Sequence, residues 1–400
     1  MKRVKTIALL LAVGMLLSLA ACGVPKTAPA ETTAAPTPTE TPAPAPAATP
    51  DPNAVTVTDL AGRQVSLVPG SCRRVACVGP GALRMYSYIG DENLLCGVED
   101  VDNPSVNGPY NTYPRAYVLV YGDVFAQKPS CGAGGPDAQG PELDKLQACK
   151  PDVVVTTFAQ AADAMQQTLG VPVIVLENGP MGVFDQAFKD SMTLLGTVFA
   201  NEAKALDLNG FIDYEVGQIR RRLSTLEDEY RITAYIGGLG EPGVDAFSTA
   251  QNYYPFEIAK IQNAVSGLPE DGVQTITREQ FDALGGAVDL LILDAGAVNA
   301  IRAEKQSDPG LLDGCAAWRS GSVCLQMMGD VYGPNYEMQL LNAWYVAKSA
   351  YPARFEDVPM LLKADEVTNY FYDEKLSETL FQYPGCYGGY QKVNTYSFFG

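Results

Sequence analysis

Histidine is absent from this chain of 400 residues. Zinc and manganese sites made of imidazoles are therefore excluded, and so are Ser-His-Asp and Cys-His catalytic groups. A bare metal ion would have to be held by oxygen ligands or by cysteine, yet no C-x-x-C spacing occurs. We accordingly predict no metal site.

Long apolar runs are also absent, because the N-terminal apolar run is shorter than the ~20 residues that a membrane-spanning helix needs and no later stretch approaches that length without charge. The N-terminal run from Ile7 to Leu19 is shorter, follows Lys2, Arg3 and Lys5, and leads through small residues to Cys22. This order predicts a signal peptide over residues 1–21, with a short transmembrane anchor as the alternative.

The tetrad L-A-A-C that ends at Cys22 resembles the bacterial lipobox. In that motif the cysteine is acylated on its sulfur and becomes the mature N-terminus. We therefore expect an extracytoplasmic protein that is anchored to a bacterial cell membrane by lipid at Cys22 and does not span the membrane.

Positive charge is scarce, with 28 lysines and arginines against 46 aspartates and glutamates, for a net charge of −18. Such an acidic surface repels nucleic acid and anionic lipid headgroups. We expect no nucleic-acid partner, and contact with the membrane through the lipid alone.

Cysteine is present at nine positions, and assigning Cys22 to lipid leaves an even number. Export permits disulfides, but the sequence cannot choose among the many pairings. Several of these cysteines, such as Cys77 and Cys324, lie inside apolar runs, where a buried free thiol is an equally good interpretation.

Residues 22–54 combine the lipid-bearing cysteine with a linker of proline, threonine, alanine and glutamate, which cannot bury a core and acts as a spacer. Two alternating stretches between Val55 and Val68 then predict a β-hairpin. The folded part follows as an N-terminal α/β lobe (55–183), helices that include an interlobe helix (184–228) and a C-terminal α/β lobe with closing helices (229–400).

Those lobes are inferred from a recurring unit of a continuous apolar strand, a loop and a helical pattern. Strands that are apolar on both faces indicate mainly parallel sheets covered by helices. Between the two lobes the spacing of apolar residues becomes that of a helix. After Asn201, a candidate N-cap, one long helix is predicted to extend to about Leu226. The expected fold is α/β, with two lobes joined by this helix and a ligand cleft between them. The strands read RVACVG, NLLCGV, PDVVVTT, VPVIVL, RITAYIGG, VDLLILDAG and GSVCLQM, and further helical patterns cover 336–351 and 360–371.

The stretch VACVGPGALR (75–84) has a strand, glycines and a helix start, as in phosphate-binding loops. Arg84 stands where a dinucleotide fingerprint needs its third glycine, and the P-loop lysine is missing. Two interpretations remain open, a tight turn or a ligand-contacting loop at a strand end. Glycine-rich loops at 131–146 and 236–248 could face the same cleft, and Tyr253 and Tyr254 are either packing residues or an aromatic wall for a ligand.

Several segments together resemble the substrate-binding lipoproteins of iron-complex ABC importers: VTVTDLAGRQVSL, RVACVGPGALRMYSYIGDENLLCGVED, LDKLQACKPDVVVTT, NAWYVAKSAYPARFEDV and KADEVTNYFY. The resemblance runs from Val55 to Val393. It implies a monomeric binding protein, not an enzyme and without a cofactor, that captures an iron complex. A ferric siderophore is the first expectation, with haem or cobalamin as alternatives, and an ABC permease with its ATPase is the implied partner.

In that family an acidic residue on each lobe docks onto the permease. The resemblance carries this role to Asp144, with neighbouring Glu142 as a substitute, and to Glu279 in the run Thr277-Arg278-Glu279-Gln280. The alternative for each is a solvated surface carboxylate.

Ligand contacts in the family come from loops that vary between members. Arginine or tyrosine in such loops often holds the ligand, which singles out Arg84, Arg302, Tyr332 and Tyr336, with Arg84 expected to line the cleft. Without histidine, haem would need tyrosine or methionine as its axial ligand. The full set of candidate contacts is Pro80, Gly81, Ala82, Arg84, Gly135, Asp137, Phe158, Gly240, Glu241, Tyr253, Tyr254, Asp294, Asn299 and Tyr332.

Two other classes of function remain as alternatives. A surface hydrolase could use paired carboxylates such as Glu241, Asp245 or Asp294. An extracellular sensor of the same fold would bind a ligand without any permease.

Overall fold

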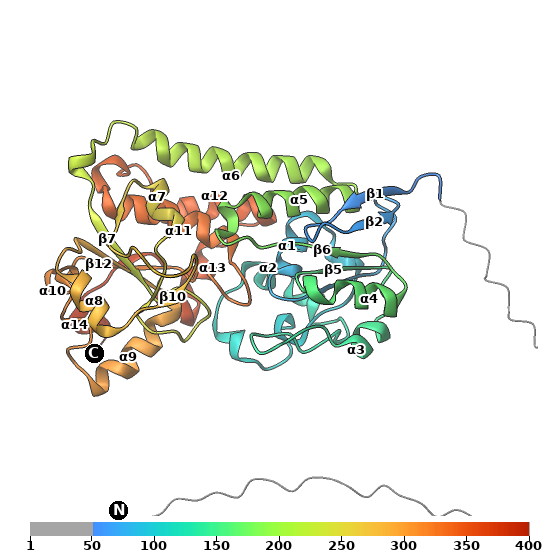
Figure 1. Ribbon diagram of the computed structural model, residues 1–400, viewed down its shortest axis with the longest axis horizontal. Helices are drawn as coiled ribbons and strands as arrows, with labels where there is room; N and C mark the ends of the chain where they lie inside the picture. Colours follow the sequence, from blue (N-terminus) through green and yellow to red (C-terminus); the bar gives the residue numbers. More distant parts are fainter. Residues whose placement is uncertain (1–50, 400) are drawn as a thin grey trace, which may run out of the picture. The chain divides into compact units, whose positions relative to one another are not determined.

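The computed structural model describes residues 51–399 (Figure 1). The predicted signal peptide, the lipid-bearing Cys22 and nearly all of the linker lie outside the described residues. The described chain opens with the expected hairpin, in which β1 (Val55–Thr58) and β2 (Gln64–Leu67) pair antiparallel.

The N-terminal lobe contains a parallel sheet of order β4-β3-β5-β6 whose strand residues are all buried. Alternate residues face two different cores. Val75 and Cys77 pack in the core that also holds residues of α1 and α5, whereas Ala76 and Val78 pack with residues of α3 and α4. Burial on both faces explains the unbroken apolar runs in the sequence. The bounds are β3 Val75–Val78, β4 Leu95–Gly97, β5 Val153–Thr156, β6 Val173–Val175, α1 Ala82–Ile89, α2 Ala116–Phe125, α3 Leu143–Ala148, α4 Ala162–Leu169 and α5 Gln186–Phe199.

The C-terminal lobe contains a sheet of order β13-β12-β11-β7-β9, in which only β13 runs antiparallel to its neighbour. A small antiparallel pair, β8 (Ser248–Thr249) with β10 (Gln274–Thr275), lies beside it. The remaining bounds are β7 Thr233–Gly237, β9 Gln262–Asn263, β11 Leu290–Asp294, β12 Val323–Gln326, β13 Gln391–Lys392, α7 Tyr254–Ile258, α8 Arg278–Gly285, α9 Val298–Ser307, α10 Ala316–Ser320, α11 Tyr336–Ala350, α12 Met360–Tyr372, α13 Ser377–Gln382 and α14 Thr395–Phe398.

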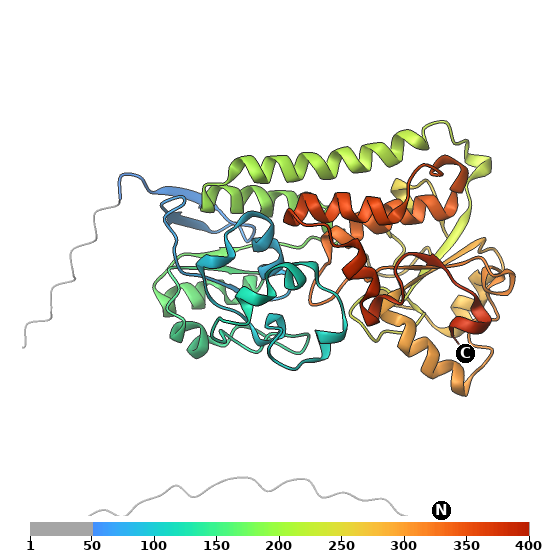
Figure 2. The same cartoon turned by 180° about the vertical axis from the view of Figure 1, so that it is seen from behind.

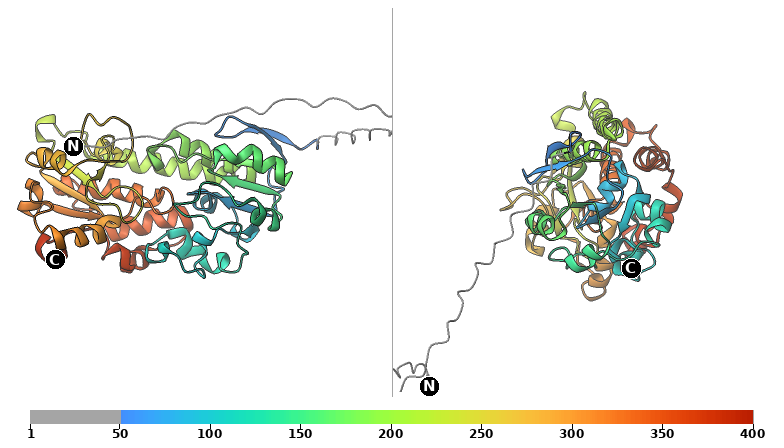
Figure 3. Two further views of the ribbon diagram at one scale, coloured as in Figure 1. Left: turned by 60° about the horizontal axis from the view of Figure 1, so that its bottom comes forward. Right: turned by 90° about the vertical axis from the view of Figure 1, so that its right-hand side faces the viewer.

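One long helix, α6 (Glu202–Arg222), passes from one lobe to the other above α5 and α12 (Figures 1 and 2). Its 21 residues span about 31 Å. The right-hand view of Figure 3 looks along this helix. It ends at Arg222, a turn earlier than the sequence pattern predicted. Asn201 occupies the N-cap position, but its side-chain amide donates to the carbonyl of Ile89 at 2.8 Å and does not cap the helix.

This architecture confirms the predicted fold class, two α/β lobes with mainly parallel sheets joined by a long helix. Among residues 51–399, no helix combines the length and the apolar character needed to cross a bilayer.

Candidate functional site

The loop after β12 crosses from the C-terminal lobe to the N-terminal lobe. We call residues 328–335 the tongue. It folds back on itself through a bridge between Asp330 and Pro334, and Tyr332 and Gly333 both adopt positive φ. A Cβ added to Gly333 would lie 2.8 Å from the backbone nitrogen of Gly81, so only glycine permits this contact with the loop after β3.

Arg84 holds the tongue from the N-terminal lobe. Its guanidinium donates to the carbonyls of Val331 at 2.7 Å, Gly333 at 2.8 Å and Pro334 at 2.5 Å. The residue is 0% exposed and lies over the ring of Tyr117. Arg84, which the sequence placed along the cleft, is thus fully buried, and both of its terminal nitrogens donate to the tongue.

Two glutamates, buried Glu99 and half-buried Glu241, hold the tongue from either side. Glu99 accepts from the backbone of Gly79 at 3.0 Å and from the hydroxyl of Tyr332 at 2.8 Å. Burial, reinforced by nearby Asp102, raises the pKa of Glu99 to about 8. Glu241 accepts from the hydroxyl of Tyr110 and from the backbone nitrogens of Tyr332 and Gly333 at 3.0 to 3.2 Å.

Asp330 lies within the tongue, close to Glu241. Burial raises the pKa of Asp330 well above its usual value, and the neighbouring Glu241 carboxylate raises it further. Its Oδ1 is buried and has no partner among the described residues. Burial and the adjacent Glu241 carboxylate therefore both favour the protonated form of Asp330.

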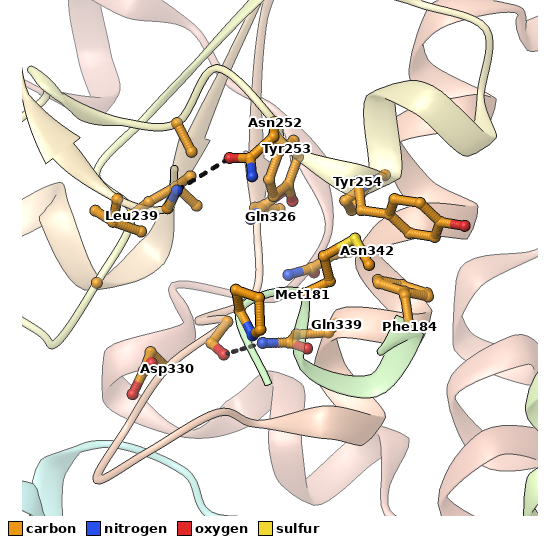
Figure 4. Close-up of a pocket in the computed structure, with 17 residues that line it drawn as sticks. Met181, Phe184, Leu239, Asn252, Tyr253, Tyr254, Gln326, Asp330, Gln339 and Asn342 are labelled. Atoms are coloured by element: carbon orange, nitrogen blue, oxygen red, sulfur yellow. Dashed lines mark hydrogen bonds between the residues drawn. The ribbon is translucent and has the colours of Figure 1, made fainter. Parts of the chain in front are cut away.

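A cavity of about 140 Å³ lies beside the tongue, between the lobes (Figure 4). Met181 and Phe184 approach it from the segment after β6, and Tyr253 and Tyr254 approach it from the C-terminal lobe. The ring centroids of Phe184 and Tyr254 are 5.2 Å apart. The lining residues are Pro180, Met181, Phe184, Leu239, Gly240, Ala250, Asn252, Tyr253, Tyr254, Pro255, Gly272, Val273, Gln326, Gly329, Asp330, Gln339 and Asn342.

The amides in this wall are bonded within the protein. Gln326 accepts from the Tyr253 hydroxyl at 2.9 Å and donates to Asp294 at 3.1 Å. Gln339 accepts from the backbone of Val183 at 3.0 Å and donates to the carbonyl of Gly329 at 3.2 Å. No lysine or arginine belongs to the lining. The wall therefore presents aromatic and apolar faces with pre-oriented amides and no positive charge.

Asp294 supports this wall from behind. Its carboxylate accepts from the backbones of Gly296 at 2.9 Å and Gly329 at 3.0 Å as well as from Gln326. Burial raises the pKa of Asp294 to about 7. Asp245, another acid considered for hydrolysis, accepts from the backbones of Phe247 and Ser248.

The predicted contact residues fall into three groups. Gly240, Tyr253 and Tyr254 line the cavity. A second group contacts or adjoins the tongue or supports the wall behind it: Pro80, Gly81, Ala82, Arg84, Gly135, Glu241, Asp294 and Tyr332. Asp137 and Asn299 are exposed, and Phe158 is half-buried beside Gly79.

Two further candidates are engaged elsewhere. Arg302 donates to the carbonyl of Phe398, and buried Tyr336 donates to the side chain of Asn178 at 2.7 Å.

Sequence reasoning missed most of the cavity wall. Phe184, Gln326, Gln339 and Asn342 lie within predicted strands and helices and carried no signal of a ligand site, and Met181 lies outside every predicted element. Asp330 lies in the loop after β12, and nothing in the sequence set it apart.

The two predicted docking acids occupy equivalent places on the lobes. Asp144 lies in the first turn of α3 and Glu279 in the first turn of α8, and both are exposed. Glu142 is engaged locally, because it accepts from the backbone of Ala133 at 2.6 Å and pairs with Lys145 at 3.1 Å. These two contacts lower the pKa of Glu142.

All eight cysteines within residues 51–399 are free and buried. The sequence left two interpretations open, disulfides or buried free thiols, and the structure contains buried free thiols. In the same part of the chain, no group of three or more cysteine or acidic side chains is arranged to hold a metal ion.

Comparisons with known proteins agree with this architecture. A family model described as periplasmic binding protein matches residues 75–312. Among solved structures, a periplasmic solute-binding protein from Veillonella parvula superposes with a TM-score of 0.63 at 18% identity, covering 83% of this chain and 96% of that chain. The molybdate-binding protein MolA from Haemophilus influenzae gives 0.61 at 16%, covering 80% and 98%. CeuE from Helicobacter pylori gives 0.57 at 13%, covering 82% and 99%. At these identities the likeness shows the fold, and no curated protein matches the chain.

Proposed function

Because this chain belongs to the periplasmic binding protein family, we propose that it captures a metal chelate outside the cytoplasmic membrane and delivers it to an ABC permease. Family membership makes it an extracytoplasmic solute-binding protein and not an enzyme. The proposal adds the class of ligand, the permease and a lipid anchor at Cys22.

The observation that carries the ligand class is the absence of positive charge from the cavity wall. An anionic ligand would have to leave water without any cationic partner, and such burial is costly. Three hydroxamate anions neutralise ferric iron, so a ferric trishydroxamate siderophore carries no charge at its iron centre. We therefore favour such a siderophore, with cobalamin second, over haem carboxylates or an oxyanion.

The size of the cavity determines how a chelate would sit. Sites for small molecules usually occupy about 300–1,000 Å³, whereas this cavity holds about 140 Å³. One arm or face of a chelate would fill it against Phe184 and Tyr254. The rest of the chelate would overlap the volume that the tongue occupies, so binding of a whole chelate requires the tongue to move.

Delivery to a permease is supported by the exposed acids Asp144 and Glu279, one on each lobe. Residues with this placement suit recognition by arginines, because exposed charges steer association and fix orientation. The lipid anchor is supported by the lipobox-like sequence that ends at Cys22.

Titration of the full chain tests the ligand class, with quenching of tyrosine and tryptophan fluorescence as the readout. We expect saturable binding of a ferric trishydroxamate or cobalamin, and much weaker binding of a ferric triscatecholate, haem or molybdate. Tighter binding of the anionic ligands would contradict the assignment, and no response to any of the five would contradict the chelate proposal as a whole.

A further inference from the structure

The outward face of α6 is unusually apolar for a solvated surface. Leu206 is 76% exposed and Tyr214 is 58% exposed. Small residues Ala203, Gly210 and Gly217 recur every seven positions on the same exposed face. Side chains seven positions apart lie above one another on a helix, so the face alternates between large and small residues.

The two glycines are not required by the fold. Each glycine in a helix interior costs about 1 kcal/mol relative to alanine. A Cβ added at Gly210 or Gly217 would meet nothing within 4 Å. Packing within the described chain thus offers no reason for either glycine, whereas close approach of another backbone would.

A groove of about 830 Å³ continues this face toward α12. Its floor is the ring of Phe211 stacked on Tyr370, with centroids 3.8 Å apart, and Asp207, Asp365 and Glu366 belong to its lining. In Figures 1 and 2, α6 lies along the edge of the molecule away from α3 and α8. A partner docked at Asp144 and Glu279 would therefore leave this face free.

We propose that the occupant is a second copy of this chain, with the two α6 helices packed antiparallel about a two-fold axis between residues 211 and 212. In a two-fold interface each contact occurs twice. This axis places Leu206 opposite Gly217 of the second copy and Gly210 opposite its Asp213, and it sets Tyr214 beside its Gly210. Each large side chain, Leu206 or Tyr214, then packs against a glycine of the second copy, as in knobs-into-holes packing.

Charge along α6 favours the same arrangement. Acidic Glu202 and Asp207 lie in its first half, whereas Arg220, Arg221 and Arg222 form its last turn. Antiparallel pairing about this axis places Arg221 of one copy opposite Glu202 of the other. Parallel pairing would place like charges together. A single helix pair buries little surface, so the dimer is of the weak class.

This proposal does not depend on the identity of the ligand, and it revises the sequence-based expectation of a monomer. Crosslinking on the full chain tests the geometry directly. All eight cysteines of the described residues are buried, so a cysteine introduced by Asp213→Cys near the axis is the reactive surface thiol, and the parent chain controls for Cys22. A short bis-maleimide should give a covalent dimer with Asp213→Cys and none with Leu362→Cys, which is 62% exposed on α12 outside the groove lining.

Sedimentation of the full chain measures the equilibrium. We expect Gly217→Leu and Leu206→Glu each to weaken the dimer by at least about tenfold. Leucine is a better helix former than glycine, so Gly217→Leu should keep or raise the thermal stability of each copy while the dimer is lost. Leu362→Glu is the matched control and should leave the dimer unchanged.

Charge reversal supplies the sharpest outcome. Arg221→Glu should weaken the dimer, and adding Glu202→Arg, at the position opposite it in the second copy, should restore it. A chain that stays monomeric at every concentration, a crosslink to another protein alone, or a failure of the double reversal to restore the dimer would each overturn the proposal.

Discussion

The guanidinium of Arg84 acts on backbone that lies 247 to 250 positions later in the chain. A local pattern could identify Arg84 as the residue that replaces a fingerprint glycine, but it could not show which carbonyls it meets. A buried guanidinium with three carbonyl partners stabilises the contact between lobes, because each unpartnered buried carbonyl costs about 1–3 kcal/mol.

Replacing this side chain should therefore be costly. We expect Arg84→Met to lower the free energy of unfolding by about 3 kcal/mol or more, because it leaves the tongue carbonyls without donors. Urea unfolding of the full chain measures the change. Arg319→Met, at an exposed arginine of α10, is the control and should cost about 0.5 kcal/mol or less. Equal effects of the two variants would contradict the assigned role.

Asp294 makes stability depend on pH. Its pKa rises from 3.8 to about 7 in the folded chain, so folding favours the protonated form. The contribution is complete below pH 4 and is lost as pH rises through 7. We expect the free energy of unfolding to fall over this range, by up to about 4 kcal/mol from this group alone.

Urea unfolding across pH 4–8 checks this prediction. Asp294→Asn should flatten the slope, and the residual slope belongs to other buried acids such as Glu99, whose pKa is raised to about 8. An unchanged slope in Asp294→Asn would show that Asp294 ionises normally.

At the scale of elements, strands were easier to predict than loops. β5 and β11 are buried at every position, and continuous burial leaves a continuous apolar run in the sequence. The end of α6 was placed about one turn too late, since the apolar pattern continues through Leu223 and Leu226 after the helix has ended. The tongue has no periodic pattern, and its conformation depends on the opposite lobe.

The tongue offers a test with a matched pair of glycines. Gly333 and Gly321 both have positive φ, but only at Gly333 would an added Cβ meet backbone, 2.8 Å from the nitrogen of Gly81. Gly321→Ala should cost about 1–2 kcal/mol for the left-handed conformation alone. Gly333→Ala should cost at least about 1 kcal/mol more, because the contact between lobes must also give way. Thermal unfolding of both variants measures the difference, and equal costs would show that the tongue adjusts freely.

At the scale of the whole molecule, the surface proposed for capture and the surface proposed for delivery differ in kind. The cavity between the lobes has no lysine or arginine in its lining, whereas Asp144 and Glu279 are exposed at two helix starts. The two activities should therefore separate by mutation.

We expect Asp144→Lys and Glu279→Lys each to lower uptake of the bound chelate into cells by about tenfold while leaving its dissociation constant unchanged. Cell uptake and fluorescence titration provide the two measurements. Glu229→Lys, at an exposed acid beyond the end of α6, is the control and should change neither. A parallel loss of binding would instead place these acids in the ligand site.

The sequence by itself determined the α/β class, the parallel sheets and the long helix between them, because burial of strands and helices leaves a periodic signal in neighbouring residues. It also excluded imidazole chemistry through the absence of histidine. Only the tertiary structure decided that Arg84 holds the tongue, that the described cysteines are free thiols and that Met181, Phe184 and Gln326 share a cavity. Those outcomes depend on contacts between residues far apart in the chain, which no local pattern encodes.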